Sequence, residues 1–394
     1  EKAGGGISEM IPFTQYGSLL IIYIFTLLLI PAIIANLFQK KIKYYGIVLS
    51  IPMFILLLGL DSLAIKLFCV FIVCELILII AYYYISKKIS SEFVYFIVLG
   101  MSILPIFLVK LSVYTRFSGV GFIGISYISF RIWQLIIDIH DKHIEKLSFG
   151  TIIYFITFFP TLSSGPIDRY ERFQQDANRV IPRTEYLTEY LGAGLRKIGK
   201  GIIYKFGFAF LINQYIILSL PEEHTIKTII IYMYAYTLYL FFDFAGYSSM
   251  AIGSGYILGI KVMENFNKPF LARNMKEFWE RWHISLSTWF GDYIYKRFVL
   301  NNMRNGLFKN KKNAARCGNM VTMLVMGIWH GPYLFYILYG LYEGIALVIT
   351  DIYMKSKVYK NLKKRKYYNW LSRVVCFHVV AVGMLIFSGY LFSI

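Results

Sequence analysis

The chain has 394 residues, of which 57% are hydrophobic and 16% are charged, and its mean hydropathy is +0.57. Soluble domains have about 45–50% apolar and about 25% charged residues. The composition therefore excludes a soluble domain and predicts an all-α polytopic membrane protein. We attribute the net charge of +19 to basic residues in cytoplasmic loops and expect no nucleic-acid partner. The four cysteines are too few for a disulfide framework and are expected to be reduced.

Residues 1–9 (EKAGGGISE) precede the first methionine and lack the basic and apolar regions of a secretory signal. We interpret them as a disordered or non-native extension. Residues 10–394 contain no soluble stretch long enough to fold alone, and we predict that they form one integral-membrane domain.

A transmembrane helix needs about 20 mainly apolar residues, and many runs reach or approach that length. With interrupted candidates at 122–139 and 248–260, they predict roughly 9–11 transmembrane helices, some entering the bilayer without crossing it. Residues 181–200 are predicted to form an amphipathic helix at the membrane surface. The apolar runs are 18–38, 46–60, 62–85, 93–109, 149–163, 202–220, 226–247, 319–350 and 371–393.

Loop charges predict the orientation. The basic loops 39–45 and 86–92 follow the first and third runs, whereas the loop 59–62 has no Lys or Arg. By the positive-inside rule, both termini lie outside the cell, and the basic segments 296–316 and 355–368 lie in the cytoplasm. We expect a multi-pass protein of the plasma membrane.

Two upstream polar stretches are predicted to be structural. The segment 160–173 (PTLSSGPIDRYERF) has a Gly-Pro turn followed by a local ion pair between Asp168 and Arg169. His140 and His143 have a spacing that a metal could use, but only Asp is nearby as a third ligand, and we predict no metal site. His224 is expected to lie in a solvated loop.

Residues 241–259 (FFDFAGYSSMAIGSGYILG) combine a carboxylate with a face of small residues. Ala245, Ser249 and Gly253 recur at every fourth position, which suits close helix packing. Asp243 lies among Phe residues and needs a cation or hydrogen-bond donors, for which we predict Arg281.

The stretch 274–290 (NMKEFWERWHISLSTWF) is predicted to be one helix. Trp279 and His283 then share an aromatic face, whereas Glu277 and Arg281 have the spacing of an ion pair. One histidine on such a face is more commonly a buried residue satisfied by one hydrogen bond. A catalytic interpretation requires a second ionisable group in the same cavity.

His330 can supply that group. It lies in the apolar run 323–340 (MLVMGIWHGPYLFYILYG), where an ionisable residue is costly and usually faces a cavity. Gly331 and Pro332 are predicted to break the helix after His330, and irregular backbone at membrane depth is tolerated where it lines a cavity. No Gly-rich phosphate loop or G-x-S-x-G elbow is found, so ATPase and serine-hydrolase chemistry have no support.

Three motifs together resemble the membrane-bound O-acyltransferase (MBOAT) family: FFDFAGYSSMAIG, NFNKPFLARNMKEFWERWHISLSTWF before DYIY, and GIWHG. GISYISFR (124–131) and SGPIDRY (164–170) extend the resemblance, which covers roughly 120–350. The pairing of RWHISLS with WHG is specific. Residues 295–310 (YKRFVLNNMRNGLFKN) differ from the YIPLGG-like stretch of alginate O-acetylase-like members. The chain is more similar to the branch that acts in teichoic-acid D-alanylation.

The resemblance implies a helical bundle around a central tunnel, with His330 as the catalytic group and His283 as a second signature residue that holds substrate or stabilises an oxyanion. Acyl transfer from a thioester to a hydroxyl needs a base, and general acid–base catalysis is worth typically 10²–10⁴-fold. The residues expected to line the tunnel are Trp279, Trp282, Trp329, Asp243, Arg281 and Ser285.

This branch takes D-alanine from a phosphopantetheine thioester on a small, acidic, cytoplasmic carrier protein, and the acyl group moves toward teichoic acid outside with other membrane proteins of the system. The resemblance therefore implies a mobile phosphopantetheine arm as donor and no tightly bound cofactor. Residues 296–308 mix apolar and basic side chains, which suits an acidic carrier and equally a membrane-surface helix. The predicted docking residues are Val299, Leu300, Met303, Arg297 and Arg304.

Two other functions fit the same features. An O-acetyltransferase of an exported polysaccharide would share the family motifs. A transporter or flippase would also have many membrane spans with buried His and Asp residues, but its acylated product would survive replacement of His330.

Overall fold

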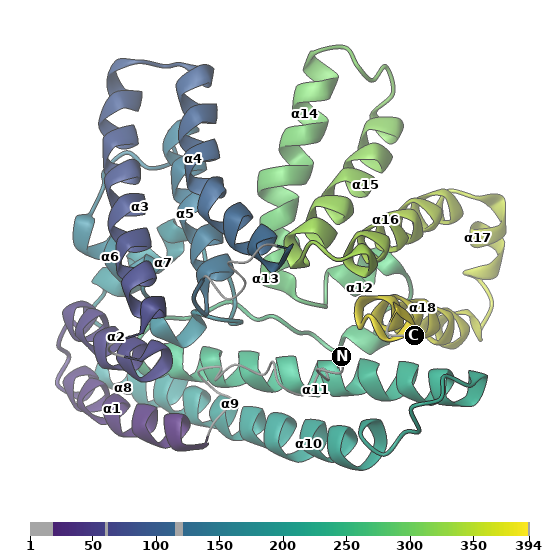
Figure 1. Cartoon of the computed structure of the whole chain (residues 1–394), viewed down its shortest axis with the longest axis horizontal. Coiled ribbons are helices and arrows are strands. Elements are labelled where there is room, and N and C mark those ends of the chain that lie inside the picture. The colour runs from purple at the N-terminus through teal and green to yellow at the C-terminus, as the bar shows by residue number, and fades with distance from the viewer. Residues whose placement is uncertain (1–18, 60–61, 115–120, 393–394) are drawn as a thin grey trace. The chain divides into compact units, whose positions relative to one another are not determined.

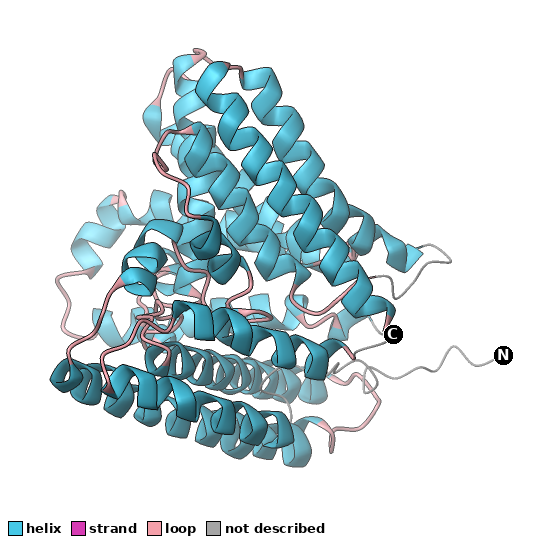
Figure 2. Cartoon of the chain, turned by 90° about the vertical axis from the view of Figure 1, so that its left-hand side faces the viewer, coloured by secondary structure: helices cyan, strands magenta, loops and turns pink. Residues whose placement is uncertain are grey.

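The structure is a computed structural model that describes residues 19–59, 62–114 and 121–392, so the predicted extension at 1–9 lies outside the described part. The described residues are mainly helical and contain no strand (Figure 2); their one isolated backbone bridge joins Phe266 and Trp282. The chain divides into two compact units, residues 1–200 with 247–263 and residues 201–246 with 264–394.

In the first unit, α3 and α4 form a hairpin against which α5 packs (Figure 1). Serine N-caps start both helices of the hairpin. Ser62 Oγ accepts a hydrogen bond from the amide of Ile65, and Ser91 Oγ accepts one from the amide of Val94. The helices are α1 (Leu19–Leu37), α2 (Lys43–Leu58), α3 (Leu63–Lys88), α4 (Glu92–Leu111), α5 (Ile125–His140), α6 (Phe149–Ile156), α7 (Tyr170–Asn178), α8 (Arg183–Glu185) and most of α9 (Gly192–Ile202).

In the second unit, α15 and α16 pack closely through glycines. A Cβ atom on Gly340 would lie 2.5 Å from the carbonyl of Met323, so only glycine allows this approach. The helices are α10 (Phe210–Ile212), α12 (Met275–Trp279), α13 (Ile284–Phe290), α14 (Lys296–Arg304), α15 (Lys311–His330), α16 (Leu334–Met354), α17 (Lys357–Leu362) and α18 (Tyr368–Phe387). Helix α11 (Ile226–Ile257) contributes residues to both units.

Short 3₁₀ and π-helical segments join or extend these helices. The π segments at 186–191, 203–209 and 213–217 make the chain helical without a break from Arg183 to Ile217. The prediction of a helix at 181–200 is therefore confirmed, but the helix continues into the run predicted at 202–220. The remaining segments are Ser112–Tyr114, Phe159–Thr161, Pro269–Leu271, Gly291–Tyr295 and Tyr390–Phe392.

The small-residue face of α11 packs against this long helix, as the sequence predicts. Ser249 Oγ donates to the carbonyl of Lys197 at 2.8 Å. A Cβ atom on Gly253 would lie 2.5 Å from the carbonyl of Gly194.

Six described helices are long and apolar enough to cross a membrane, which makes the chain a multi-pass membrane protein. The number is lower than the predicted 9–11 because other apolar runs form shorter or more polar helices: α2 has 16 residues, and α6 ends at Ile156. The spans are Leu20–Leu37, Leu63–Lys88, Glu92–Tyr114, Ile226–Ile257, Leu334–Met354 and Tyr368–Phe387.

Candidate active site

His283 lies at a break between two short helices. The prediction of one continuous helix over 274–290 is wrong, because α12 ends at Trp279 and α13 begins at Ile284. His283 adopts the left-handed conformation, with φ 44° and ψ 51°. Few residues other than glycine take this conformation, although His is enriched among them, and such positions cluster at functional sites.

The break is held by pairing with the preceding segment, residues 265–267. The amide of Ile284 donates to the carbonyl of Asn265 at 3.0 Å, and the amide of Asn267 donates to the carbonyl of Arg281 at 2.9 Å. Ser285 Oγ donates to Asn265 Oδ1 at 2.6 Å, and both residues are fully buried. The predicted helix is therefore interrupted by hydrogen bonds to residues 265–267. These residues lie outside the stretch 274–290 from which the helix was predicted.

Trp279 ends α12 and Trp282 lies within the break, in different surroundings. Trp279 Nε1 donates to the Glu343 carboxyl at 3.1 Å. Trp282 packs against a cluster of aromatic rings, including a stacked contact with Phe278 at 5.5 Å between centroids. The buried aromatic environment predicted for this stretch is confirmed, but Glu343, which accepts from Trp279, was not among the predicted site residues.

The predicted partners of the charged residues are partly wrong. Arg281 pairs with Glu277 at 2.7 Å, as expected from their spacing. Asp243, however, pairs with Lys205 and not with Arg281. Lys205 lies on the long helix beside α11, a neighbour that the sequence does not reveal.

His330 ends helix α15, and Gly331 and Pro332 follow it before α16 begins at Leu334. The predicted helix break is confirmed. Aromatic rings surround the imidazole: its centroid lies 4.7 Å from that of Trp329 and 4.9 Å from that of Phe387.

His330 contributes to the electrostatic environment of His283. His283 is buried, packs edge-on against Phe244 at 4.6 Å between centroids, and lies outside the six candidate spans. Burial, and secondarily His330, lower the pKa of His283 to about 3, so its imidazole is neutral in the physiological range. His330 is therefore the candidate for the second ionisable group, and a cavity shared by the two histidines stays a prediction.

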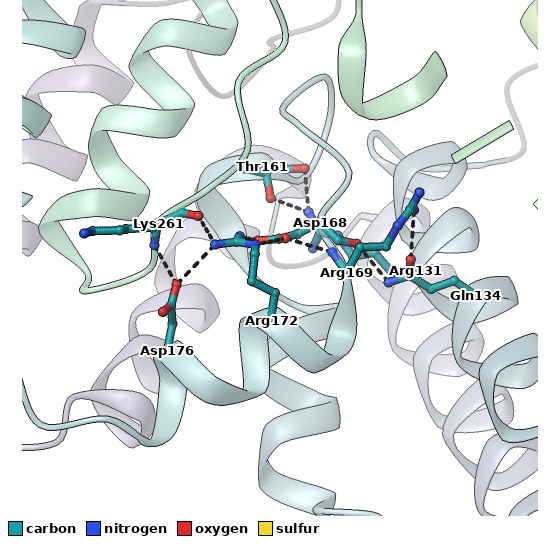
Figure 3. A network of polar contacts seen from close by, with 8 residues as sticks. All are labelled: Arg131, Gln134, Thr161, Asp168, Arg169, Arg172, Asp176 and Lys261. Atoms are coloured by element: carbon teal, nitrogen blue, oxygen red, sulfur yellow. Dashed lines mark hydrogen bonds and ion pairs between the residues drawn. The ribbon is translucent and has the colours of Figure 1, made fainter. Parts of the chain in front are cut away.

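A buried polar network occupies the first unit, around Arg131 (Figure 3). Arg131 is 1% exposed, and its guanidinium donates to backbone carbonyls at and after the end of α6 and to the Thr161 hydroxyl. The acceptors are the carbonyls of Phe155, Ile156, Phe158 and Thr161 and the hydroxyl of Thr161.

The SGPIDRY segment joins this network through Gln134, whose Nε2 donates to the carbonyl of Asp168 and whose Oε1 accepts from Arg169. Asp168 is buried and forms its ion pair with Arg172, four residues later, and not with Arg169. Arg172 also binds Asp176 at 3.3 Å and the carbonyl of Lys261. The segment is therefore fixed from both sides in the first unit and is more than a loop with one local ion pair.

The predicted docking residues lie on α14. Leu300 is 55% exposed, and Arg304 is also exposed. Val299 and Met303 are half-buried, and Val299 packs against Gly318 of α15, where its Cγ2 atom lies 2.8 Å from the position of a Cβ atom. Arg297 is half-buried as well.

The other histidines have structural contacts. His140 stacks on Tyr95 at 3.9 Å between centroids, and its Nδ1 lies 3.0 Å from the Tyr82 hydroxyl. His224 lies in a loop, as predicted, but it is half-buried and stacks on Tyr390 at 4.2 Å between ring centroids. The cysteines are free thiols, as predicted.

These features define a polytopic helical membrane protein in which two histidines each lie at a helix break among aromatic side chains. The sequence model of the membrane-bound O-acyltransferase family, MBOAT, matches residues 47–393, and the chain belongs to this family. It is an acyltransferase.

Several named enzymes are similar to this chain over two thirds or more of its length. The teichoic acid D-alanyltransferase of Bacillus subtilis (strain 168) is 39% identical over 388 residues, 95% of this chain and 98% of the relative. That of Streptococcus thermophilus is 35% identical over 92% of each chain. A probable alginate O-acetylase of Pseudomonas aeruginosa is 32% identical over 68% of this chain and 48% of its own length.

Proposed function

We propose that the chain transfers D-alanine from the phosphopantetheine thioester of an acidic carrier protein toward (lipo)teichoic acid. The observation that carries the proposal is the pair of histidines: His330 ends α15 at the Gly-Pro break, and His283 is buried in the turn between α12 and α13. Two D-alanyltransferases match almost the whole chain, whereas the alginate O-acetylase matches about two thirds of it.

His330 is the general base of the proposed reaction. Its imidazole accepts the proton of the acceptor hydroxyl, whose oxygen attacks the thioester carbonyl carbon and forms a tetrahedral oxyanion. The C–S bond then breaks, an ester remains, and the phosphopantetheine thiolate takes the proton from the His330 imidazolium. Protons and electrons balance without an added cofactor.

His283 stabilises the oxyanion in this proposal. A neutral imidazole retains one N–H donor, and the lowered pKa of His283 keeps it in that form. Donors fixed in a dry site are worth more than donors in water, because they need not reorganise during the reaction. Fixing His283 in a strained backbone conformation is consistent with such a role.

The aromatic surroundings support transfer over hydrolysis. Rings of Trp329 and Phe387 flank His330, and Phe244 covers His283. Apolar walls limit the access of water, which would otherwise compete with the acceptor hydroxyl for the thioester. The proposed donor arrives on a flexible arm from the cytoplasmic face, where α14 presents Leu300 and Arg304 to an acidic carrier. The proposed topology places both chain termini outside the cell.

The test is incorporation of labelled D-alanine into teichoic acid by membranes that contain the loaded carrier. We expect His330→Ala to abolish incorporation and His283→Ala to reduce it by roughly 10²-fold or more, with both proteins folded and inserted in the membrane. His378→Ala is the matched control, because this histidine lies in α18 and bonds the carbonyl of Val374. Incorporation at the wild-type rate by His330→Ala would refute the base assignment.

An O-acetyltransferase of an exported polysaccharide is the second candidate, favoured by the match to the alginate O-acetylase. The acyl donor distinguishes the two candidate functions. A D-alanyltransferase binds a carrier loaded with D-alanine, whereas an O-acetyltransferase transfers acetyl groups without that carrier. A transporter would move its substrate but would leave acylated product intact in His330→Ala.

A further inference from the structure

A groove of about 460 Å³ lies between α16 and α18 in the second unit. Its walls are mainly apolar, with Ile345 and Ile349 on α16 and Leu371 and Val375 on α18. These four side chains are exposed in the structure, and both helices are candidate membrane spans. The groove therefore opens where hydrocarbon chains of the bilayer are expected.

The two ends of the groove differ. At one end, the Tyr342 hydroxyl donates to the carbonyl of Val379 at 2.8 Å and ties α16 to α18. At the other end, Tyr353, Tyr367 and Tyr368 line the groove. Tyrosines are enriched at membrane–water interfaces, so this aromatic end is placed at the level of the lipid headgroups.

Positive charge gathers at the aromatic end. Leu362 and Tyr367 both line the groove, and the four residues between them, Lys363, Lys364, Arg365 and Lys366, are all exposed. Arg273 also lines the groove.

Acidic residues near this end are already engaged by cations. Glu277 binds both Arg273 and Arg281, and Asp351 binds Arg316 and Lys355. The headgroup end therefore carries a net positive charge. Basic pockets between membrane helices are a recognised form of site for anionic lipid headgroups.

We propose that this groove binds an anionic phospholipid, with one acyl chain between α16 and α18 and the phosphate held by Arg273 and the cluster Lys363–Lys366. This site is separate from the two histidines and does not depend on the proposed acyl donor. The predicted cytoplasmic location of residues 355–368 assigns the lipid to the inner leaflet. A free phosphate would use the same cations but would leave the apolar groove unfilled.

The test uses the purified, delipidated full-length protein in detergent. We expect phosphatidylglycerol to raise the unfolding temperature and to remain bound in native mass spectra, whereas phosphatidylcholine has a smaller effect and inorganic phosphate has none. Ile349→Trp fills the groove and should abolish the phosphatidylglycerol effect. Ile77→Trp on α3 is the matched control, because Ile77 is 63% exposed and Ile349 is 60% exposed.

A second variant tests whether the positive charge of residues 363–366 contributes to lipid binding. Replacing Lys363, Lys364, Arg365 and Lys366 by Gln should lower phosphatidylglycerol retention more than tenfold and should leave phosphatidylcholine retention unchanged. Equal stabilisation by the two lipids, or full phosphatidylglycerol binding by Ile349→Trp, would overturn the proposal. The proposal would also be overturned if a protein helix or a second copy of the chain co-purifies and Ile349→Trp releases it while lipid binding is unchanged.

Discussion

The indole Nε1 of Trp279 donates a 3.1 Å hydrogen bond to the carboxyl Oε2 of Glu343, and both side chains are buried. Trp279 ends α12, directly before the turn that carries His283. Glu343 belongs to α16, which begins after the Gly-Pro break that follows His330. The bond therefore connects the two segments that carry the histidines.

We predict that this bond positions His283. Trp279→Phe removes the donor and Glu343→Leu removes the acceptor, so each variant should lower kcat about tenfold, in line with about 1–1.5 kcal/mol for a buried hydrogen bond. Glu343→Gln keeps an acceptor oxygen and should retain most activity. The double variant Trp279→Phe/Glu343→Leu should be no slower than either single variant, because they remove the same interaction. A Glu343→Gln enzyme as slow as Glu343→Leu would indicate that the carboxyl itself exchanges protons.

The lowered pKa of His283 predicts a pH dependence of stability. In the unfolded chain a histidine has a pKa of about 6.5, whereas in the folded protein the pKa of His283 is about 3. Between these values the unfolded state binds more protons, so acidification favours unfolding and the stabilising contribution is lost as pH falls. We expect the unfolding temperature of the wild type to fall more steeply below pH 6.5 than that of His283→Asn.

Asn is the suitable replacement because it tolerates the left-handed backbone conformation and does not titrate. His378→Asn serves as the control and should follow the wild-type curve. Parallel curves for wild type and His283→Asn would show that His283 is protonated in the folded protein at mildly acidic pH.

The sequence predicts the segments of this site better than their geometry. Hydrocarbon-like runs identify the membrane helices, and the Gly-Pro pair after His330 identifies a helix break, because both signals are local. The break at His283 has no such local signal, and its cause is the pairing with Asn265 and Asn267. Periodicity within 274–290 cannot reveal a partner outside that range.

One unrecognised helix and one long-range partner explain the remaining errors. Asp243 pairs with Lys205 and Asp168 pairs with Arg172, where the sequence suggested Arg281 and Arg169. An i,i+4 rule could have found Arg172 once residues 170–178 were recognised as a helix. Lys205 becomes a neighbour of Asp243 only through the packing of two long helices.

Leu300 is the suitable residue for testing the proposed carrier-docking surface on α14, because Leu300 is exposed whereas Val299 is packed. Leu300→Asp should weaken carrier binding at least tenfold, because it adds a negative charge to a surface expected to meet an acidic protein. Its unfolding temperature should match that of the wild type. Val299→Asp buries a charge against Gly318 and should mainly destabilise the protein, so it cannot report on docking.

Val358→Asp is the control for this measurement, because Val358 is 58% exposed on another basic segment. It should leave carrier affinity unchanged. If Leu300→Asp also binds the carrier with wild-type affinity, the docking surface lies elsewhere.

The guanidinium of Arg131 is predicted to be irreplaceable by an ammonium group. It reaches five acceptors through a planar fork, of which Figure 3 draws those on Thr161, whereas lysine has three donors at one point. Arg131→Lys should leave buried carbonyls unsatisfied and lower the free energy of unfolding by about 2–4 kcal/mol. Arg179→Lys changes an exposed pair with Glu185 and should cost less than about 1 kcal/mol. Equal unfolding temperatures for the two variants would refute this account.

The contact between α11 and the long helix predicts opposite effects at two glycines. A Cβ atom on Gly253 would lie 2.5 Å from the carbonyl of Gly194, and a Cβ atom on Gly199 would meet nothing within 4 Å. The atom that the new Cβ would meet is a backbone carbonyl, which cannot move aside as the end of a flexible side chain can. Gly253→Ala should therefore separate the helices and lower the unfolding temperature by several degrees. Gly199→Ala should be neutral or stabilising, since alanine favours a helix by about 1 kcal/mol over glycine. A stable Gly253→Ala protein would mean that the two helices are not in close contact at this position.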